Sequence, residues 1–171
     1  MSAVAPHLRA AYGLARWLLG NDHDAEDAAQ DAYVRAFRHF DGFNGINPRG
    51  WLLAIVRRCC YDTLARRRAG EIGEFDEQEH SEDGDASPLS GQRHDGPERA
   101  ALRADDARLL NEAVAALPVE YREAFVLREL EGLTYKEIAD VAGLPIGTVM
   151  SRLSRARALL QRALRAPGEP S

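Results

Sequence analysis

Apolar residues recur at helical spacing in two stretches of this 171-residue chain, and neither stretch shows the strict apolar–polar alternation of a half-buried β-strand. In the first stretch the spacing predicts three helices: residues 6–19, 23–40 and 48–68. Either Asp22 or Asp24 is expected to cap the second of them, because an aspartate oxygen can accept a hydrogen bond from an unpaired N–H at a helix start. The pattern therefore predicts an all-α fold.

The second stretch ends in a pair of helices separated by a tight break. Two further helices are predicted before that pair: residues 97–117 and 119–131. The first helix of the pair begins after Thr134, which can form a capping box with Glu137, and it ends at Gly143. A longer helix begins near Pro145, since proline fits a first helical turn. A short helix, a glycine turn and a longer helix together make a helix-turn-helix.

Residues 69–98 differ from both stretches in charge and composition. They carry ten acidic residues and one basic residue, a net charge of −9, whereas the rest of the chain has a net charge of +4. With few apolar side chains, this segment cannot bury enough surface to offset the entropy lost on ordering. We therefore expect two small helical domains, residues 1–68 and 99–171, joined by a disordered acidic linker.

The last predicted helix has one apolar and one polar face. The apolar face is expected to be buried and comprises Ile146, Val149, Leu153, Ala156 and Leu160. Thr148, Ser151 and Arg155 lie opposite, with Arg152 on the flank. A helix-turn-helix places the start of its second helix in the DNA major groove, where such side chains contact bases and phosphates. The alternative is a solvated basic face on a helical hairpin.

The helix over residues 48–68 also has two faces. Its apolar face comprises Leu52, Ile55, Val56, Cys59 and Thr63. The other face carries Arg57, Arg58 and Tyr61, which suit melted nucleic acid because the charges pair with phosphate and the ring stacks on a base. Phe43 and Asn44 in the preceding loop could hold an unstacked base. Exposed arginines are common, however, and Phe43 could equally belong to the core.

The helix over residues 23–40 has a small-residue inner face: Ala25, Ala28, Ala29, Ala32 and Ala36. Its outer face carries Asp27, Gln30 and Asp31 beside the apolar Val34 and Phe37, which suits a protein partner better than DNA. A solvated face is the alternative. Asp27 and Asp31 lie one turn apart and could share a cation, but no second acidic motif faces them, so no metal site is expected.

Cys59 and Cys60 are the only cysteines, and they are adjacent. Neighbours on a helix point about 100° apart, so a disulfide between them would be strained. We interpret both as core residues; a redox-sensing thiol is the alternative. No apolar run reaches the about 20 residues of a membrane span, and the N-terminus lacks the features of a secretory signal. These observations predict a cytoplasmic protein with no membrane insertion.

Three segments, in this order, resemble the bacterial RNA polymerase sigma factors of the extracytoplasmic-function (ECF) group. They are "DAEDAAQDAYVRAF" (24–37), "NPRGWLLAIVRRCCYDTLARRR" (47–68) and "LPVEYREAFVLRELEGLTYKEIADVAGLPIGTVMSRLSRARALL" (117–160). The resemblance covers nearly the whole chain, and the "GTV-S-RL-RAR" pattern after the helix-turn-helix is distinctive of the group. Two positions depart from the family pattern: Arg58 stands where asparagine is common, and Met150 where lysine or arginine is frequent.

The resemblance implies a transcription initiation factor whose site residues fall into three groups. Those binding core RNA polymerase, at the clamp of its largest subunit, would be Asp27, Gln30, Asp31 and Val34. Those recognising and melting the minus-ten promoter element would be Phe43, Asn44, Arg57, Arg58 and Tyr61. Those reading the minus-thirty-five element would be Thr148, Ser151, Arg152 and Arg155. Because the two domains together carry a net charge of only +4, we expect weak binding to promoter DNA without polymerase.

Further partners implied by the resemblance are the flap of the second largest polymerase subunit, promoter DNA in its double-stranded and melted forms, and an anti-sigma factor. In the holoenzyme the protein would be associated with the nucleoid. No cofactor and no enzymatic activity are expected. Two alternatives remain: a stand-alone helix-turn-helix regulator that dimerises on a palindrome, and an enzyme that uses the aspartates of residues 23–40 as metal ligands.

Overall fold

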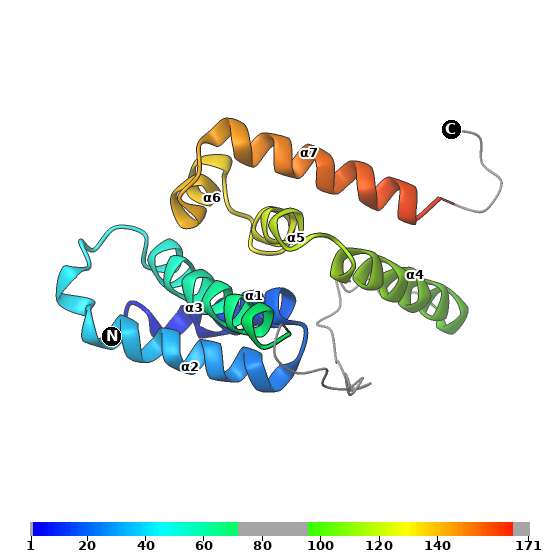
Figure 1. The fold of residues 1–171 in the computed structure, drawn as a ribbon. Coiled ribbons are helices and arrows are strands. Elements are labelled where there is room, and N and C mark those ends of the chain that lie inside the picture. Colours follow the sequence, from blue (N-terminus) through cyan, green and yellow to red (C-terminus); the bar gives the residue numbers. More distant parts are fainter. Residues whose placement is uncertain (1, 72–95, 166–171) are drawn as a thin grey trace.

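The computed structural model describes residues 2–71 and 96–165, and the disorder predicted for the acidic linker therefore concerns residues that lie largely outside these ranges. Every regular element in the described ranges is helical, as the apolar spacing predicted. Figure 1 shows two groups of helices, with α5 and α6 of the second group lying beside α1 and α3 of the first. The first group comprises η1 (Ala5–His7), α1 (Leu8–Leu19), α2 (Asp22–Arg38), η2 (Phe40–Gly42) and α3 (Pro48–Glu71).

The corner between α1 and α2 is formed by a glycine and an asparagine. Gly20 takes a left-handed conformation with φ of 83°, which stops α1. Asn21 then has an extended backbone, and its side chain accepts a hydrogen bond from the Asp24 N–H at 2.8 Å. The prediction that Asp22 or Asp24 caps α2 was therefore wrong. Both lie in the first turn instead, where their negative charges interact favourably with the helix dipole.

Small side chains bring α2 close to its neighbours. Ala25, Ala28, Ala32 and Ala36 are buried as predicted, while Ala29 is only half-buried. This alanine face packs against both α1 and α3. Because the face carries only methyl groups, the three helix axes can approach closely, and the larger outward-facing side chains of α2 remain in solvent.

The buried face of α3 is displaced from the predicted one, toward Leu53 and Cys60. Its buried apolar side chains are Leu52, Leu53, Val56, Cys59 and Cys60. Ile55 and Thr63, which were assigned to the apolar face, are only half-buried. The difference arises because α3 is covered from two sides, by α1 and α2 and also by α6 of the second group.

The second group comprises α4 (Pro97–Ala115), α5 (Val119–Phe125), η3 (Val126–Leu130), α6 (Tyr135–Ala142) and α7 (Ile146–Ala163). The helix predicted over residues 119–131 is continuous, but its last part, η3, is a π-helix. There the Glu131 N–H donates to the Val126 carbonyl, five residues earlier, at 3.1 Å. Gly132, with φ of 67°, ends this helix as expected.

The helix-turn-helix formed by α6 and α7 matches the prediction closely. The Thr134 hydroxyl and the Glu137 backbone form one half of the capping box, and the Glu137 carboxylate and the Thr134 backbone form the other, each at 3.1 Å. Gly143 ends α6 with φ of 66°. Four of the five predicted apolar residues of α7 are buried, but Ile146 is 42% exposed because it stands at the first position of the helix. Leu144, before the helix, is half-buried.

Candidate nucleic-acid interface

The polar face of α7 is open to solvent and lies beside α5. Arg155 and Ser151 are exposed, whereas Thr148 and Arg152 are partly buried. A shallow hollow at this face is lined by Glu120, Tyr121, Thr148, Ser151, Arg152 and Arg155. Arg155 Nη1 donates to the Tyr121 hydroxyl at 3.3 Å, which holds the guanidinium over this hollow. All four residues predicted for base and phosphate contacts are therefore brought together on one accessible surface.

The loop before α3 contains an aromatic cluster. The Phe43 ring lies 4.9 Å from the Trp51 ring and 5.8 Å from the Phe40 ring, measured between centroids, and Phe43 is half-buried. Asn44 Oδ1 accepts a hydrogen bond from the Ile46 N–H at 3.0 Å and so shapes the loop itself. Ile46, which was not predicted as a site residue, is 73% exposed.

Arg57 and Tyr61 on α3 are engaged by the other domain rather than by solvent. Arg57 Nε donates to the Glu123 carboxylate of α5, and the Tyr61 hydroxyl donates to the same carboxylate at 2.5 Å. The Arg57 guanidinium also lies 4.4 Å from the centroid of the Tyr61 ring. Burial, reinforced by the Glu123 charge, raises the pKa of Tyr61, so its hydroxyl remains a donor. Arg58, the next residue, stays exposed.

Glu123 is the residue of this cluster that was not predicted from the sequence. It is 2% exposed and is the one buried charged side chain in the described part of the chain. Val119 and Leu127 lie four residues before and after it and place it on the apolar side of α5. An acid in the middle of an apolar helical stripe is the signal that could have identified it.

A second polar contact joins the two domains near the start of α3. Arg49 Nη1 donates to the Glu131 carbonyl at 3.0 Å, at the end of η3. Burial raises the pKa of the Glu131 carboxyl, and the Arg49 charge opposes that shift. Both ends of the α3 face that meets the second domain are thus held by arginines of the first domain.

The outer face of α2 carries the residues predicted to bind a protein partner. Asp27, Gln30 and Asp31 are exposed, and the apolar Val34 and Phe37 are 45% and 66% exposed. Asp31 pairs with Arg35 at 2.9 Å, within the same helix. The outer face of α2 thus combines large exposed apolar side chains with exposed acidic ones. No described part of the chain covers this surface.

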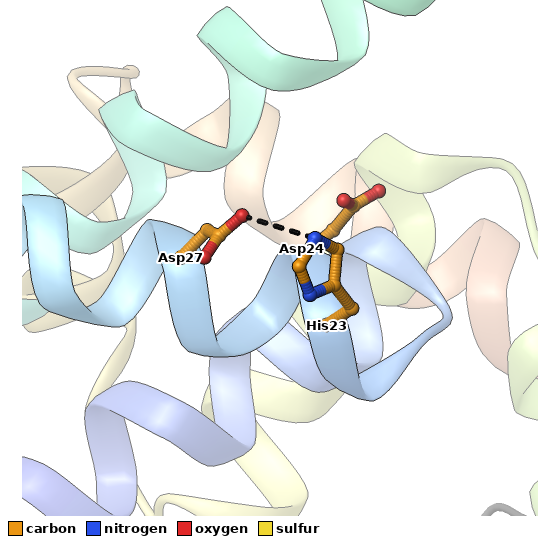
Figure 2. A group of neighbouring side chains, drawn as sticks. All are labelled: His23, Asp24 and Asp27. Atoms are coloured by element: carbon orange, nitrogen blue, oxygen red, sulfur yellow. Dashed lines mark ion pairs between the residues drawn. The ribbon is translucent and has the colours of Figure 1, made fainter.

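One histidine and two aspartates lie together at the start of α2. The side chains of His23, Asp24 and Asp27 are close enough to one another to hold a metal ion (Figure 2). His23 Nε2 lies 3.5 Å from the Asp27 carboxylate. The Asp24 carboxylate, however, is already paired with Arg67 and accepts a hydrogen bond from Asn21 Nδ2 at 3.2 Å. The ion pairs with Arg67 and His23, together with the capping residue Asn21, explain why these side chains lie close together without a metal ion.

The two cysteines lie in the core of the first domain, as predicted from the sequence. Cys59 and Cys60 are both buried and free. Burial raises the pKa of Cys59 to about 11 and that of Cys60 to about 12. At neutral pH both side chains are therefore thiols rather than reactive thiolates.

Comparison with known families matches each domain separately. Residues 3–70 match the family model "Sigma-70 region 2", and residues 107–160 match "Sigma-70, region 4". The chain is also 31% identical to the ECF RNA polymerase sigma factor SigW of Bacillus subtilis over 158 residues, which is 90% of this chain and 82% of SigW. The chain belongs to the ECF sigma factors. This family comprises non-enzymatic transcription factors that direct RNA polymerase to promoters.

Two further sigma factors match most of this chain. The chain is 36% identical to SigE of Mycolicibacterium smegmatis over 161 residues, covering 92% of this chain but 58% of SigE. It is 33% identical to the RNA polymerase sigma-H factor of Pseudomonas aeruginosa over 150 residues, covering 82% and 73% of the two chains. The chain thus spans less than two thirds of the length of SigE. It spans most of the length of sigma-H and of SigW.

Two solved sigma factors share the arrangement of helices. The sigma factor RpoE of Bartonella quintana, solved in complex with the anti-sigma factor NepR, matches with a TM-score of 0.70 and 30% identity, covering 96% of this chain and 95% of RpoE. CnrH, solved with the cytosolic domain of CnrY, matches with a TM-score of 0.61 and 27% identity, covering 94% and 84%. Among the described residues, no helix has the length and apolar character needed to cross a membrane.

Proposed function

We propose that this ECF sigma factor binds core RNA polymerase in the cytoplasm and directs it to promoters that carry a minus-ten and a minus-thirty-five element. The N-terminal domain (1–68) binds the polymerase and opens the minus-ten element, and the C-terminal domain (99–171) reads the minus-thirty-five element. In the holoenzyme the protein is associated with the nucleoid. Catalysis belongs to the polymerase, and the sigma factor itself has no enzymatic activity.

The exposed stripe on α2 is the observation that carries this proposal. Val34 and Phe37 are 45% and 66% exposed although both are large and apolar. Asp27, Gln30 and Asp31 lie in line with them and are also exposed. Apolar groups framed by polar ones are typical of a surface that another protein covers. We assign Asp27, Gln30, Asp31 and Val34 to the clamp of the largest polymerase subunit.

The two DNA-binding surfaces lie on different domains, which supports the reading of two elements at once. For the minus-ten strand we assign Phe43, Asn44, Arg57, Arg58 and Tyr61. For the minus-thirty-five duplex we assign Thr148, Ser151, Arg152 and Arg155. Each surface alone binds weakly, and joining both in one chain raises the effective concentration of the second after the first has bound.

Two further partners follow from the family. The C-terminal domain would contact the flap of the second largest polymerase subunit. RpoE of B. quintana, which shares the fold along nearly its whole length, was solved with an anti-sigma factor. We therefore propose that this chain is also held inactive by an anti-sigma factor until a signal releases it.

Binding to core polymerase tests the proposal with a matched pair of variants. Val34→Ala removes an apolar side chain that is 45% exposed within the α2 stripe, whereas Leu8→Ala removes one that is 41% exposed on α1. Truncating an interface anchor costs more than about 1 kcal/mol, so we expect Val34→Ala to weaken binding by about five- to tenfold or more. Leu8→Ala should bind like the wild type. A wild-type chain that has no affinity for the polymerase, but binds a palindromic DNA site as a dimer, would instead indicate a stand-alone regulator.

A further inference from the structure

The surface of α3 assigned to the minus-ten strand is occupied by the chain's own second domain. Arg57 and Tyr61 both donate hydrogen bonds to Glu123, which is 2% exposed. Only 21% of the Arg57 side chain surface remains accessible. A nucleic-acid strand could not reach the guanidinium and the phenol hydroxyl while α5 covers them.

We propose that Glu123 is an intramolecular latch that closes the two domains and masks the minus-ten surface until the domains separate. The inference rests on the proposed function, because it takes Arg57 and Tyr61 to be contacts for the promoter strand. A carboxylate presents the same kind of anionic oxygen acceptors to arginine as a phosphate does. Glu123 therefore occupies the place of the DNA backbone on this surface.

Physical chemistry makes this contact suited to reversible opening. A charged carboxylate can be buried only while its partners remain, because an unpaired buried charge is strongly unfavourable. Loss of either partner thus favours separation of the domains, which returns Glu123 to water. An intact buried ion pair, in contrast, contributes little net stability, because the cost of removing both charges from water offsets their attraction. The latch therefore fixes how the domains meet without holding them irreversibly.

The second contact across the domains uses a different kind of acceptor. Arg49 donates to the Glu131 carbonyl rather than to a carboxylate, and this bond does not depend on a side-chain charge. The Arg57–Glu123 pair is accordingly the contact that a single isosteric change, Glu123→Gln, can weaken selectively.

Energy transfer between dyes on the full chain tests the latch without DNA or polymerase. Cysteines introduced at Arg9 on α1 and Gln161 on α7, both exposed, provide the labelling sites, since the native thiols are buried. We expect Glu123→Gln to lower the transfer efficiency relative to the wild type. Glu129→Gln is the matched control, because Glu129 pairs with Arg157 at 3.2 Å inside the second domain. Equal efficiency in the wild type and Glu123→Gln would overturn the proposal.

A charge exchange provides a second variant. Glu123→Arg should open the domains, and the double variant Arg57→Glu with Glu123→Arg should restore the wild-type transfer efficiency. If the double variant stays as open as Glu123→Arg while circular dichroism shows wild-type helicity, the pairing is not what closes the domains.

Binding of a single-stranded oligonucleotide tests the masking. A labelled minus-ten non-template strand should bind the Glu123→Gln chain about tenfold more tightly than the wild type, the change expected when a competing contact of about 1.4 kcal/mol is removed. Opening without tighter binding would overturn the claim that Glu123 competes with DNA. Failure of the wild-type chain to support transcription with core polymerase would refute the proposed function instead, whatever the energy-transfer result.

Discussion

The guanidinium of Arg67, on the last turns of α3, pairs with the carboxylate of Asp24 in the first turn of α2. Arg67 Nη1 also donates to the Leu19 carbonyl at the end of α1, at 2.9 Å. One side chain thereby joins all three helices of the N-terminal domain at the corner where α1 turns into α2. The pairing with Arg67 lowers the pKa of the Asp24 carboxyl below its ordinary value.

Removing this side chain should destabilise the N-terminal domain. We expect Arg67→Ala to lower the free energy of unfolding by about 1–2 kcal/mol at pH 7, because charge-assisted hydrogen bonds are lost. Both tryptophans, Trp17 and Trp51, lie in this domain, so urea unfolding followed by tryptophan fluorescence reports on it. Arg68→Ala, at the exposed neighbouring position, is the control and should leave the midpoint unchanged.

The same pair gives the destabilisation a defined pH dependence. Because the folded-state pKa of Asp24 is lowered, the pair stabilises the fold above the unfolded pKa of about 3.9 and this contribution is lost as pH falls through the folded value. The difference in unfolding free energy between wild type and Arg67→Ala should therefore be constant from pH 5 to 7 and shrink below about pH 4. A difference that grows on acidification would contradict the ion pair.

The thiols of the core should be chemically protected. Cys59 and Cys60 are buried, and their pKa values are raised to about 11 and about 12. We expect iodoacetamide at pH 8 to alkylate neither residue in the folded chain and both in 6 M guanidinium, as measured by mass spectrometry. Labelling of the native protein at the rate of a small free thiol would revive a redox-sensing role.

The capping box should matter for the stability of the helix-turn-helix. Thr134→Ala removes the hydroxyl that accepts from the Glu137 N–H and should cost about 1 kcal/mol. Thr134→Ser keeps an acceptor at the same position and should retain nearly all of that stability. Thermal unfolding followed by circular dichroism compares the two, and equal melting temperatures for the alanine and serine variants would show that the cap contributes little.

Met150 offers a gain-of-contact prediction. It is 49% exposed on α7, one residue before Ser151, at a position where the family often has lysine or arginine. In the proposed holoenzyme, Met150→Arg should add one phosphate contact, tighten binding to a minus-thirty-five duplex and steepen the slope of log affinity against log salt by about 0.9. Met150→Gln, polar but uncharged, should leave the slope unchanged. An unchanged slope for the arginine variant would place Met150 away from the DNA backbone.

Local sequence signals predicted the local structure well. The Thr134–Glu137 capping box and the helix end at Gly143 depend on residues close together in the chain, and both were found as expected. Four of the five predicted apolar residues of α7 are buried, Ile146 being the exception. The cap of α2 was missed because the left-handed turn at Gly20 moves the helix start one residue earlier, to Asn21.

The contacts between the domains could not be predicted in the same way. Glu123 is 66 residues from Arg57 along the chain, and no helical periodicity relates the two positions. Their pairing depends on how α5 packs across α1 and α3, which is a property of the tertiary fold. The arginine face of α3 was read from the sequence as exposed to solvent, and the structure shows instead that the second domain covers much of it.

Run-off transcription with core RNA polymerase over a library of bacterial promoter fragments tests the assignment most directly. The polymerase alone should start without preference, and addition of this chain should produce discrete start sites whose upstream sequences share a minus-ten and a minus-thirty-five element. Mutating either element should abolish those transcripts. If the chain neither associates with the polymerase nor changes where transcription starts, its assignment as a promoter-directing subunit is contradicted.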